Sequence, residues 1–558
     1  MKKIVFNKQD EFKRRLGYHL RVMGNFIQNK NFLLRQGLFA ALVLGLLFSL
    51  TLAVSGETTK PKPGGVLKIR PYGRTLNTDL DPAGNGYSVV IEHLYEGLVR
   101  LDQNLAVFPA LAEYWTVSDS GKKTTFYLRK GALFHNGQEV KAEDVKFSYE
   151  RLFGLKNNPL FYLFASRIEG GEEYWSGQAS EVKGLKVIDD QTLEITWKQT
   201  NISNFYFLAA SFAKILPKNL VLAQKKRFFD RPVGAGPFKF DYWLRSPRLD
   251  IVGIRLIRND KYFERKPWLE AIEISPYFSL ENFLEDEVQV IPYLSYRISR
   301  SRYQILESNL LHVAYLFFSC HLPPFDRPEV RKAIKFFINR TELATLASTT
   351  AYFGQVMDNY IPPYLPDFVP ETEPEKLSLS QLKEVLVSAG AGDPEKPLNV
   401  NLLFSFPNKD LAGKIYEELK TELAPAGINL KLKMVDSLEQ LQEEKTPYLV
   451  YFDWLLDLPD PEFLILPLFH SGSFLNKSYF HYQNLQLDSL LEDQKNTASF
   501  DRRVGIFRQI ESLLRTEVPA IPLYYFRQRL AYQPYVKNLK SQPLGSFFLN
   551  LREAWIDR

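Results

Sequence analysis

The sequence predicts an α/β protein of two or more domains. Its 558 residues are too many for one small hydrophobic core. Residues 398–406 and 428–435 alternate as strands do, and residues 410–427 between them carry apolar side chains at helical spacing. Strand, helix and strand in this order indicate a β-α-β unit with parallel strands and a right-handed crossover. Gly427 stands where this helix should end.

Further strand patterns lie in the first 200 residues. In "QTLEITW", Leu193, Ile195 and Trp197 fall on one face of an extended chain, which predicts a half-buried strand. The same alternation predicts strands at residues 64–70 and 124–131.

One helix is expected between these strands, in "KAEDVKFSYERLF" (residues 141–153). Val145, Tyr149 and Leu152 are spaced i, i+4 and i+7, so they form one apolar stripe. Acidic residues occupy the first turn, where the helix dipole favours them. We therefore expect the stripe to pack against a core.

Three aspartates lie within or just after one strand pattern in the C-terminal third of the chain. Residues 448–454, "YLVYFDW", predict another strand of the same sheet, and Asp457 comes where that strand ends. Open α/β sheets usually hold ligands at such ends. Asp460 precedes Pro461 and suits a turn, and Asp453 can face solvent on its strand. Asp457 has no such structural explanation, and burying it without a partner would cost several kcal/mol, roughly.

Other roles for these acids are less well supported. A calcium loop needs crowded oxygen ligands and a glycine, whereas leucines and prolines surround these aspartates. Nothing else in the sequence suggests a glycosidase pair. Nucleophile elbows, P-loops, dinucleotide fingerprints and zinc-protease motifs are missing from the sequence. The single cysteine, Cys320, has no nearby base that could activate it as a nucleophile. Together with the missing motifs, this leads us to expect neither catalysis, nor a metal, nor a cofactor.

The N-terminal segment differs from the rest of the chain. Residues 1–36 hold nine Lys/Arg against two acids, which leaves the body with 61 basic and 62 acidic residues and no surface suited to nucleic acid. Residues 37–54 carry no charge, and residues 55–63 form a polar linker. Basic residues before the apolar run predict an exported body. The run is either a cleaved signal or a membrane anchor.

Several stretches together resemble one protein family. They include "LDPAGNGYSVVIEHLYEGLVRLD", then "PALAEYWTVSDSGKKTTFYLRKGALFHNGQEVKAEDVKFSYERL", then "GAGPFKF", "RNDKYFERKPWLEAIEI", "PPFDRPEVRKAIKFFINR" and the closing "VPAIPLYYF". In order and spacing they are similar to extracellular solute-binding proteins of the peptide/nickel class, family 5. The similarity extends from Gly64 to the C-terminus.

This resemblance implies a fold and a domain organisation. The fold would be α/β, two-lobed and periplasmic-binding-protein-like (type II), with hinge strands and an extra inserted subdomain. The inserted subdomain would span residues 101–184. Lobe I would combine residues 64–100, 185–313 and 523–558, and lobe II would span residues 314–522.

The resemblance also implies a binding site. In peptide-binding members, a W-x-x-D pattern supplies an aspartate that pairs with the ligand's α-ammonium, and Trp454 and Asp457 match it. The neighbouring backbone would bind the peptide as an added strand. The "DPAGNG" stretch would form an opposing wall. The predicted peptide-binding residues are Asp457, Trp454, Leu455, Gly84, Asn85 and Tyr524.

The function implied is that of a non-enzymatic, monomeric receptor outside the inner membrane. It would capture short peptides and deliver them to the permease subunits of an ABC transporter. The protein would be periplasmic, either released after cleavage or anchored through residues 37–54. Two alternatives stay open: a non-peptide ligand (nickel chelate, haem or oligosaccharide), and a membrane-tethered peptide sensor.

Overall fold

The computed structural model describes most of the chain after the predicted linker. The described ranges are 60–73, 76–84, 88–118, 121–365, 376–391, 396–405, 409–435, 437–441, 444–542 and 544–558. The predicted leader, the apolar segment, most of the linker and Asn85 lie outside these ranges. Among the helices within them, none is both long and apolar enough to cross a bilayer.

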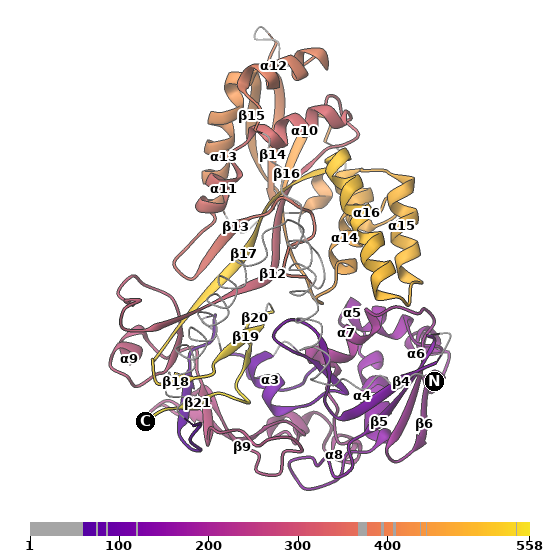
Figure 1. Cartoon of the computed structure of the whole chain (residues 1–558), viewed down its shortest axis with the longest axis vertical. Helices are drawn as coiled ribbons and strands as arrows, with labels where there is room; N and C mark the ends of the chain where they lie inside the picture. Colours follow the sequence, from indigo (N-terminus) through magenta and orange to yellow (C-terminus); the bar gives the residue numbers. More distant parts are fainter. Residues whose placement is uncertain are drawn as a thin grey trace, which may run out of the picture.

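One large mixed sheet runs through both halves of the molecule (Figure 1). Its strand order is β15-β14-β16-β12-β17-β11-β1-β10-β9-β8, and β13 pairs with β17 beside this path. The strands are β1 (Val66–Ile69), β8 (Phe238–Arg245), β9 (Ile251–Arg258), β10 (Ala271–Ile274), β11 (Val290–Pro292), β12 (Gln304–Phe318), β13 (Tyr352–Val356), β14 (Leu398–Ser405), β15 (Ile428–Val435), β16 (Tyr448–Leu455) and β17 (Ala520–Tyr532).

Two long strands, β12 and β17, connect the upper and lower halves in Figure 1. They pair with each other, while β12 also pairs with β16 above and β17 also pairs with β11 below. Their pairing shifts register between Asn309 and Val313, which marks a local irregularity in the connection. The lobe divisions at residues 313/314 and 522/523 fall within these strands and stay a prediction.

The upper half contains the predicted β-α-β unit, and its strand directions are confirmed. β14 pairs with β15 in parallel, from Leu398 opposite Ile428 onward, and α13 (Lys409–Leu423) connects them. β14 also pairs with β16, in parallel, so β16 belongs to the same sheet, as predicted. Gly427 ends the helical segment with a φ of +80°, a left-handed conformation that glycine adopts readily. Three further helices of this half are α10 (Pro328–Phe337), α11 (Arg340–Leu346) and α12 (Leu379–Ser388).

A separate four-stranded sheet lies at the lower right of Figure 1, in the order β4-β5-β7-β6. The predicted inserted subdomain, residues 101–184, ends before two of its strands, because both β6 and β7 pair into this sheet. Leu193, Ile195 and Trp197 are buried on one face, which confirms the alternation predicted for them. The strands are β4 (Ala112–Val117), β5 (Lys123–Leu128), β6 (Leu185–Asp189) and β7 (Thr192–Thr196).

Helix α4 (Ala142–Gly154) covers this sheet, and its predicted apolar stripe is confirmed. Val145, Tyr149 and Leu152 are all fully buried or nearly so. One apolar cluster continues from the sheet to α14 (Glu462–Phe469) and α16 (Phe500–Glu517) above it. The small sheet therefore shares core packing with the opposite half of the molecule.

Most of the remaining elements lie in the lower half (Figure 1). The helices of the lower half are α3 (Ser88–Leu94), α5 (Pro159–Ser166), α6 (Gly171–Ser176), α7 (Asn204–Ala209), α8 (Lys218–Gln224) and α9 (Leu280–Leu284). Helix α15 (Leu485–Lys495) lies beside α16 in the upper half (Figure 1). Three short strand pairs are β2 (Val99–Leu101) with β3 (Val107–Pro109), β18 (Val536–Lys537) with β21 (Trp555–Ile556), and β19 (Lys540–Gln542) with β20 (Gly545–Asn550).

Candidate functional site

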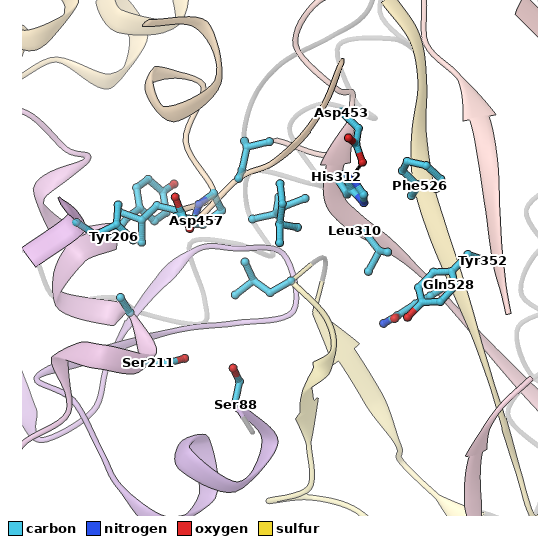
Figure 2. A pocket seen from close by; sticks show the side chains of 18 of the residues that line it. Ser88, Tyr206, Ser211, Leu310, His312, Tyr352, Asp453, Asp457, Phe526 and Gln528 are labelled. Carbon is cyan, nitrogen blue, oxygen red and sulfur yellow. Dashed lines mark hydrogen bonds and ion pairs between the residues drawn. The ribbon is translucent and has the colours of Figure 1, made fainter. Parts of the chain in front are cut away.

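A cleft of about 880 Å³ lies between the two halves of the molecule (Figure 2). Its walls come from α3 and α7 below, from β16 and the loop after it above, and from the connecting strands β12 and β17. The volume is in the range of sites that enclose small organic ligands. Most of the lining residues are apolar or aromatic, and polar or charged side chains make up about a third.

Asp457 lies in the loop that follows β16 and lines this cleft. In the described part of the chain it makes no hydrogen bond and no ion pair. Partial desolvation raises the pKa of its carboxyl group above the ordinary value for aspartate. The side chain remains accessible from the cleft. Asp457 therefore presents to the cleft a carboxylate that no described residue binds.

Trp454 and Leu455, the last two residues of β16, point to opposite faces of the strand. Leu455 lines the cleft and is 64% exposed. Trp454 points to the other face of β16, where its indole Nε1 donates to the Phe463 carbonyl oxygen at 3.0 Å. This bond spans the loop that carries Asp457. Trp454 thus braces the loop rather than lining the cleft.

Tyr524 on β17 lies behind the cleft wall. It is fully buried, and its hydroxyl oxygen is 2.9 Å from that of Tyr451, which does line the cleft. Burial raises the pKa of the Tyr524 hydroxyl, so the group stays neutral. Gly84 lies in a turn, where its backbone N–H donates to the Asp81 carbonyl oxygen at 2.9 Å. It is not among the residues that line the cleft.

The structure brings Asp457 and Leu455 together in the cleft, but it adds residues that the sequence did not single out. His312 on β12 is the main one: its Nε2 lies 2.8 Å from Oδ2 of Asp453. The His312 ring also stacks on Phe526, with centroids 4.4 Å apart. His312 and Asp453 are 141 residues apart, so no local pattern could have predicted the pair.

The electrostatic character of the cleft is acidic. Among the described residues that line it, no lysine or arginine occurs. Glu92 is one of three carboxylates there, and its charge is balanced by Lys214 at 2.9 Å. Burial acts to raise the pKa of Glu92, but Lys214 lowers it overall, so the pair is ionised. Asp453 and Asp457 have no lysine or arginine partner among the residues that the structure describes.

The described ranges contain no group of three or more His, Cys, Asp or Glu residues arranged to hold a metal ion. Cys320 lies away from the cleft lining, and its Sγ is 3.8 Å from the Pro519 carbonyl oxygen. Burial raises the pKa of this thiol to about 11, which disfavours the reactive thiolate.

Comparisons with known proteins agree with the fold. Residues 106–476 match the model of bacterial extracellular solute-binding proteins, family 5. The chain is 26% identical to the dipeptide-binding protein of Escherichia coli K12 over 503 residues, which cover 84% of this chain and 90% of that protein. It is 24% identical to heme-binding protein A of Haemophilus influenzae, covering 83% of this chain and 87% of that protein.

Among solved structures, the chain is similar to the periplasmic murein tripeptide-binding protein in its unliganded open form. The TM-score is 0.74 at 20% sequence identity, and the match covers 89% of this chain and 97% of the other. The predicted fold class, a type II periplasmic-binding-protein-like α/β fold, is confirmed.

Proposed function

The chain belongs to the bacterial extracellular solute-binding proteins of family 5, and we propose that it captures short peptides for a peptide-importing ABC transporter. It does so in the cleft between its two halves and passes the peptide to the permease subunits. On this proposal the protein acts outside the inner membrane, as a monomer and without catalysis. The relatives named for peptide binding support the ligand class.

The observation that carries the proposal is the carboxylate of Asp457. It lines a largely apolar cleft, no described residue binds it, and desolvation raises its pKa. A ligand ammonium group would satisfy it with a charge-assisted hydrogen bond. A peptide supplies this group at its N-terminus, whatever its side chains are. Asp457 is thus proposed as the amine anchor.

Main-chain recognition would add to this anchor. Leu455 is the last residue of β16 and Asp457 lies two residues beyond it, so the ligand backbone could align beside the end of that strand. Trp454 would hold the loop in position through its bond to Phe463. Tyr524 would act from behind by orienting the Tyr451 hydroxyl. Gly84 and Asn85 remain proposed parts of the opposing wall.

The test is native mass spectrometry of residues 56–558 exported to the periplasm and purified without refolding. We expect a mixture of co-purified short peptides with the parent protein and none with Asp457→Asn. Asp190→Asn is the matched control, because it removes one exposed carboxylate of the small sheet and should retain the peptides. A single haem mass, or another non-peptide mass, would contradict peptide capture while leaving the fold intact.

Affinities measured by calorimetry should show the same effect quantitatively. Loss of one partner of a desolvated charge pair costs roughly 2 kcal/mol or more, which is at least about 30-fold in Kd. We expect Asp457→Asn to weaken alanine tripeptide binding by this factor. An unchanged Kd would remove Asp457 from the site.

The pH dependence of binding should follow from the same carboxyl group. Protonated Asp457 cannot pair with an ammonium group, so peptide affinity should fall as pH decreases through its pKa. An ordinary aspartate titrates near pH 4, roughly. Because desolvation raises the pKa of Asp457, the loss of affinity should begin at a higher pH than for an ordinary aspartate. Calorimetric titrations between pH 4 and 8 check this, and Asp457→Asn should abolish that step.

A further inference from the structure

We propose that Asp453 and His312 form a second cation-binding subsite in the cleft, so that the preferred peptides carry a basic side chain in addition to the α-ammonium group. This inference rests on the proposed peptide-binding function and deepens it by naming a ligand class. It assigns a specificity role to residues outside the predicted amine anchor.

The geometry places the Asp453 carboxylate at the cleft surface. Asp453 and Leu455 lie on the same face of β16, two residues apart, and both line the cleft. The Asp453 side chain is 49% exposed, so a ligand can reach it. His312 engages only Oδ2, at 2.8 Å. Oδ1 has no partner in the described part of the chain and can accept a hydrogen bond from a ligand.

Three adjacent strands hold this carboxylate in position. Ala314 of β12 is the strand partner of Asp453, and His312 lies diagonally across from it on the same strand. The His312 ring is held in turn by Phe526 of β17, at a stacking angle of 29°. Such support fixes the carboxylate before a ligand arrives, which reduces the ordering cost of binding.

The charge balance of the cleft favours a second ligand cation. Lys214 already neutralises Glu92, whereas Asp453 has no lysine or arginine partner among the described residues and contacts His312 through Oδ2 alone. One α-ammonium group satisfies Asp457 and leaves Asp453 unbalanced. Figure 2 shows Asp457 and the Asp453–His312 pair at separate positions around the cleft. We therefore assign the two carboxylates to different cationic groups of the ligand.

The test compares tripeptides of alanine in which each position in turn is lysine or norleucine. Norleucine keeps an aliphatic stem but lacks the side-chain ammonium group, and both series retain the α-ammonium group. Kd values are measured by calorimetry at pH 8, where a free imidazole is neutral. At one position at least, we expect lysine to bind about fivefold more tightly than norleucine, as for a partly exposed charge pair.

Two variants separate recognition from a structural role. Asp453→Asn should abolish the preference for lysine and leave norleucine affinity and melting temperature unchanged. Asp457→Asn should weaken both series by the same factor and retain the preference.

Equal affinities for lysine and norleucine at every position would overturn the inference while leaving peptide capture intact. The same holds if Asp453→Asn weakens both series equally, since the residue would then be structural. If neither series binds at all, the proposed function fails, and the subsite fails with it.

Discussion

At the scale of single residues, Glu511 on α16 is an unusual buried acid. Its two carboxylate oxygens accept hydrogen bonds from the backbone N–H groups of Tyr360 and Ile361, at 2.8 and 3.1 Å. These bonds favour the ionised form, but burial outweighs them and raises the pKa of Glu511 to about 7. The residue thus links a long loop segment to α16 and makes stability depend on pH.

The sign of this dependence follows from linkage. A carboxyl group whose pKa is raised in the folded state loses its proton at a higher pH there than in the unfolded state. Between about pH 4.5 and about pH 7 the folded state therefore binds more protons, and stability falls as pH rises. Over this window the loss from Glu511 amounts to about 3 kcal/mol. We expect urea denaturation of Glu511→Gln at pH 5, 6, 7 and 8 to show a correspondingly smaller decline than the parent. The exposed residue Glu113, changed to Gln, is the control and should reproduce the parent's decline.

At the scale of secondary-structure elements, a buried ion pair joins α14 to the helix–loop region beside the small sheet. Oε1 of Glu462 accepts a hydrogen bond from Arg167 at 2.6 Å, and Oε2 accepts from Ser203 at 3.0 Å. Burial acts to raise the pKa of Glu462, but Arg167 and Arg503 lower it overall, so the group is ionised. The rings of Phe207 and Phe463 pack edge to face beside the pair. Glu462, the acid of this ion pair, lies five residues beyond Asp457 in the sequence.

Breaking this ion pair should destabilise the protein measurably. Glu462→Ala leaves Arg167 buried without its partner, which costs about 3 kcal/mol. Glu462→Ala combined with Arg167→Met should lose less than the two single changes added together, because no unpaired charge remains. Thermal denaturation of the four proteins gives the coupling. Additive losses would show that the two side chains do not interact. Glu169→Ala breaks an exposed pair with Lys183 and should not change the melting temperature.

At the scale of the whole molecule, the connection between the halves determines how the cleft can close. β12 and β17 are shared by both halves, and their register shift near Asn309 interrupts regular pairing beside the cleft. Bending at a few such residues is a common route to closure around a ligand.

We expect small-angle X-ray scattering to show a smaller radius of gyration when saturating alanine tripeptide is added. Asp457→Asn at the same peptide concentration should scatter as the free protein does. Identical curves for the parent with and without bound peptide would exclude closure.

Much of the fold and part of the site follow from local sequence patterns. Alternation predicted β16 and, two residues past its end, the uncompensated Asp457. Helical spacing predicted the buried stripe of α4, and Gly427 marked the end of the segment after α13. The family resemblance predicted the two-lobed fold. Such patterns work because side-chain direction repeats with a short period set by the backbone alone.

Only the tertiary structure decided which side chains meet. It paired His312 with Asp453 and Arg167 with Glu462, across 141 and 295 residues of sequence. It also placed Tyr524 behind the cleft wall instead of in it. The sequence by itself determined strands, helices and the position of an aspartate just after the end of β16. The partners of buried and cleft-lining groups were decided by sheet order and packing, because contacts between distant segments leave no periodic signal in either segment.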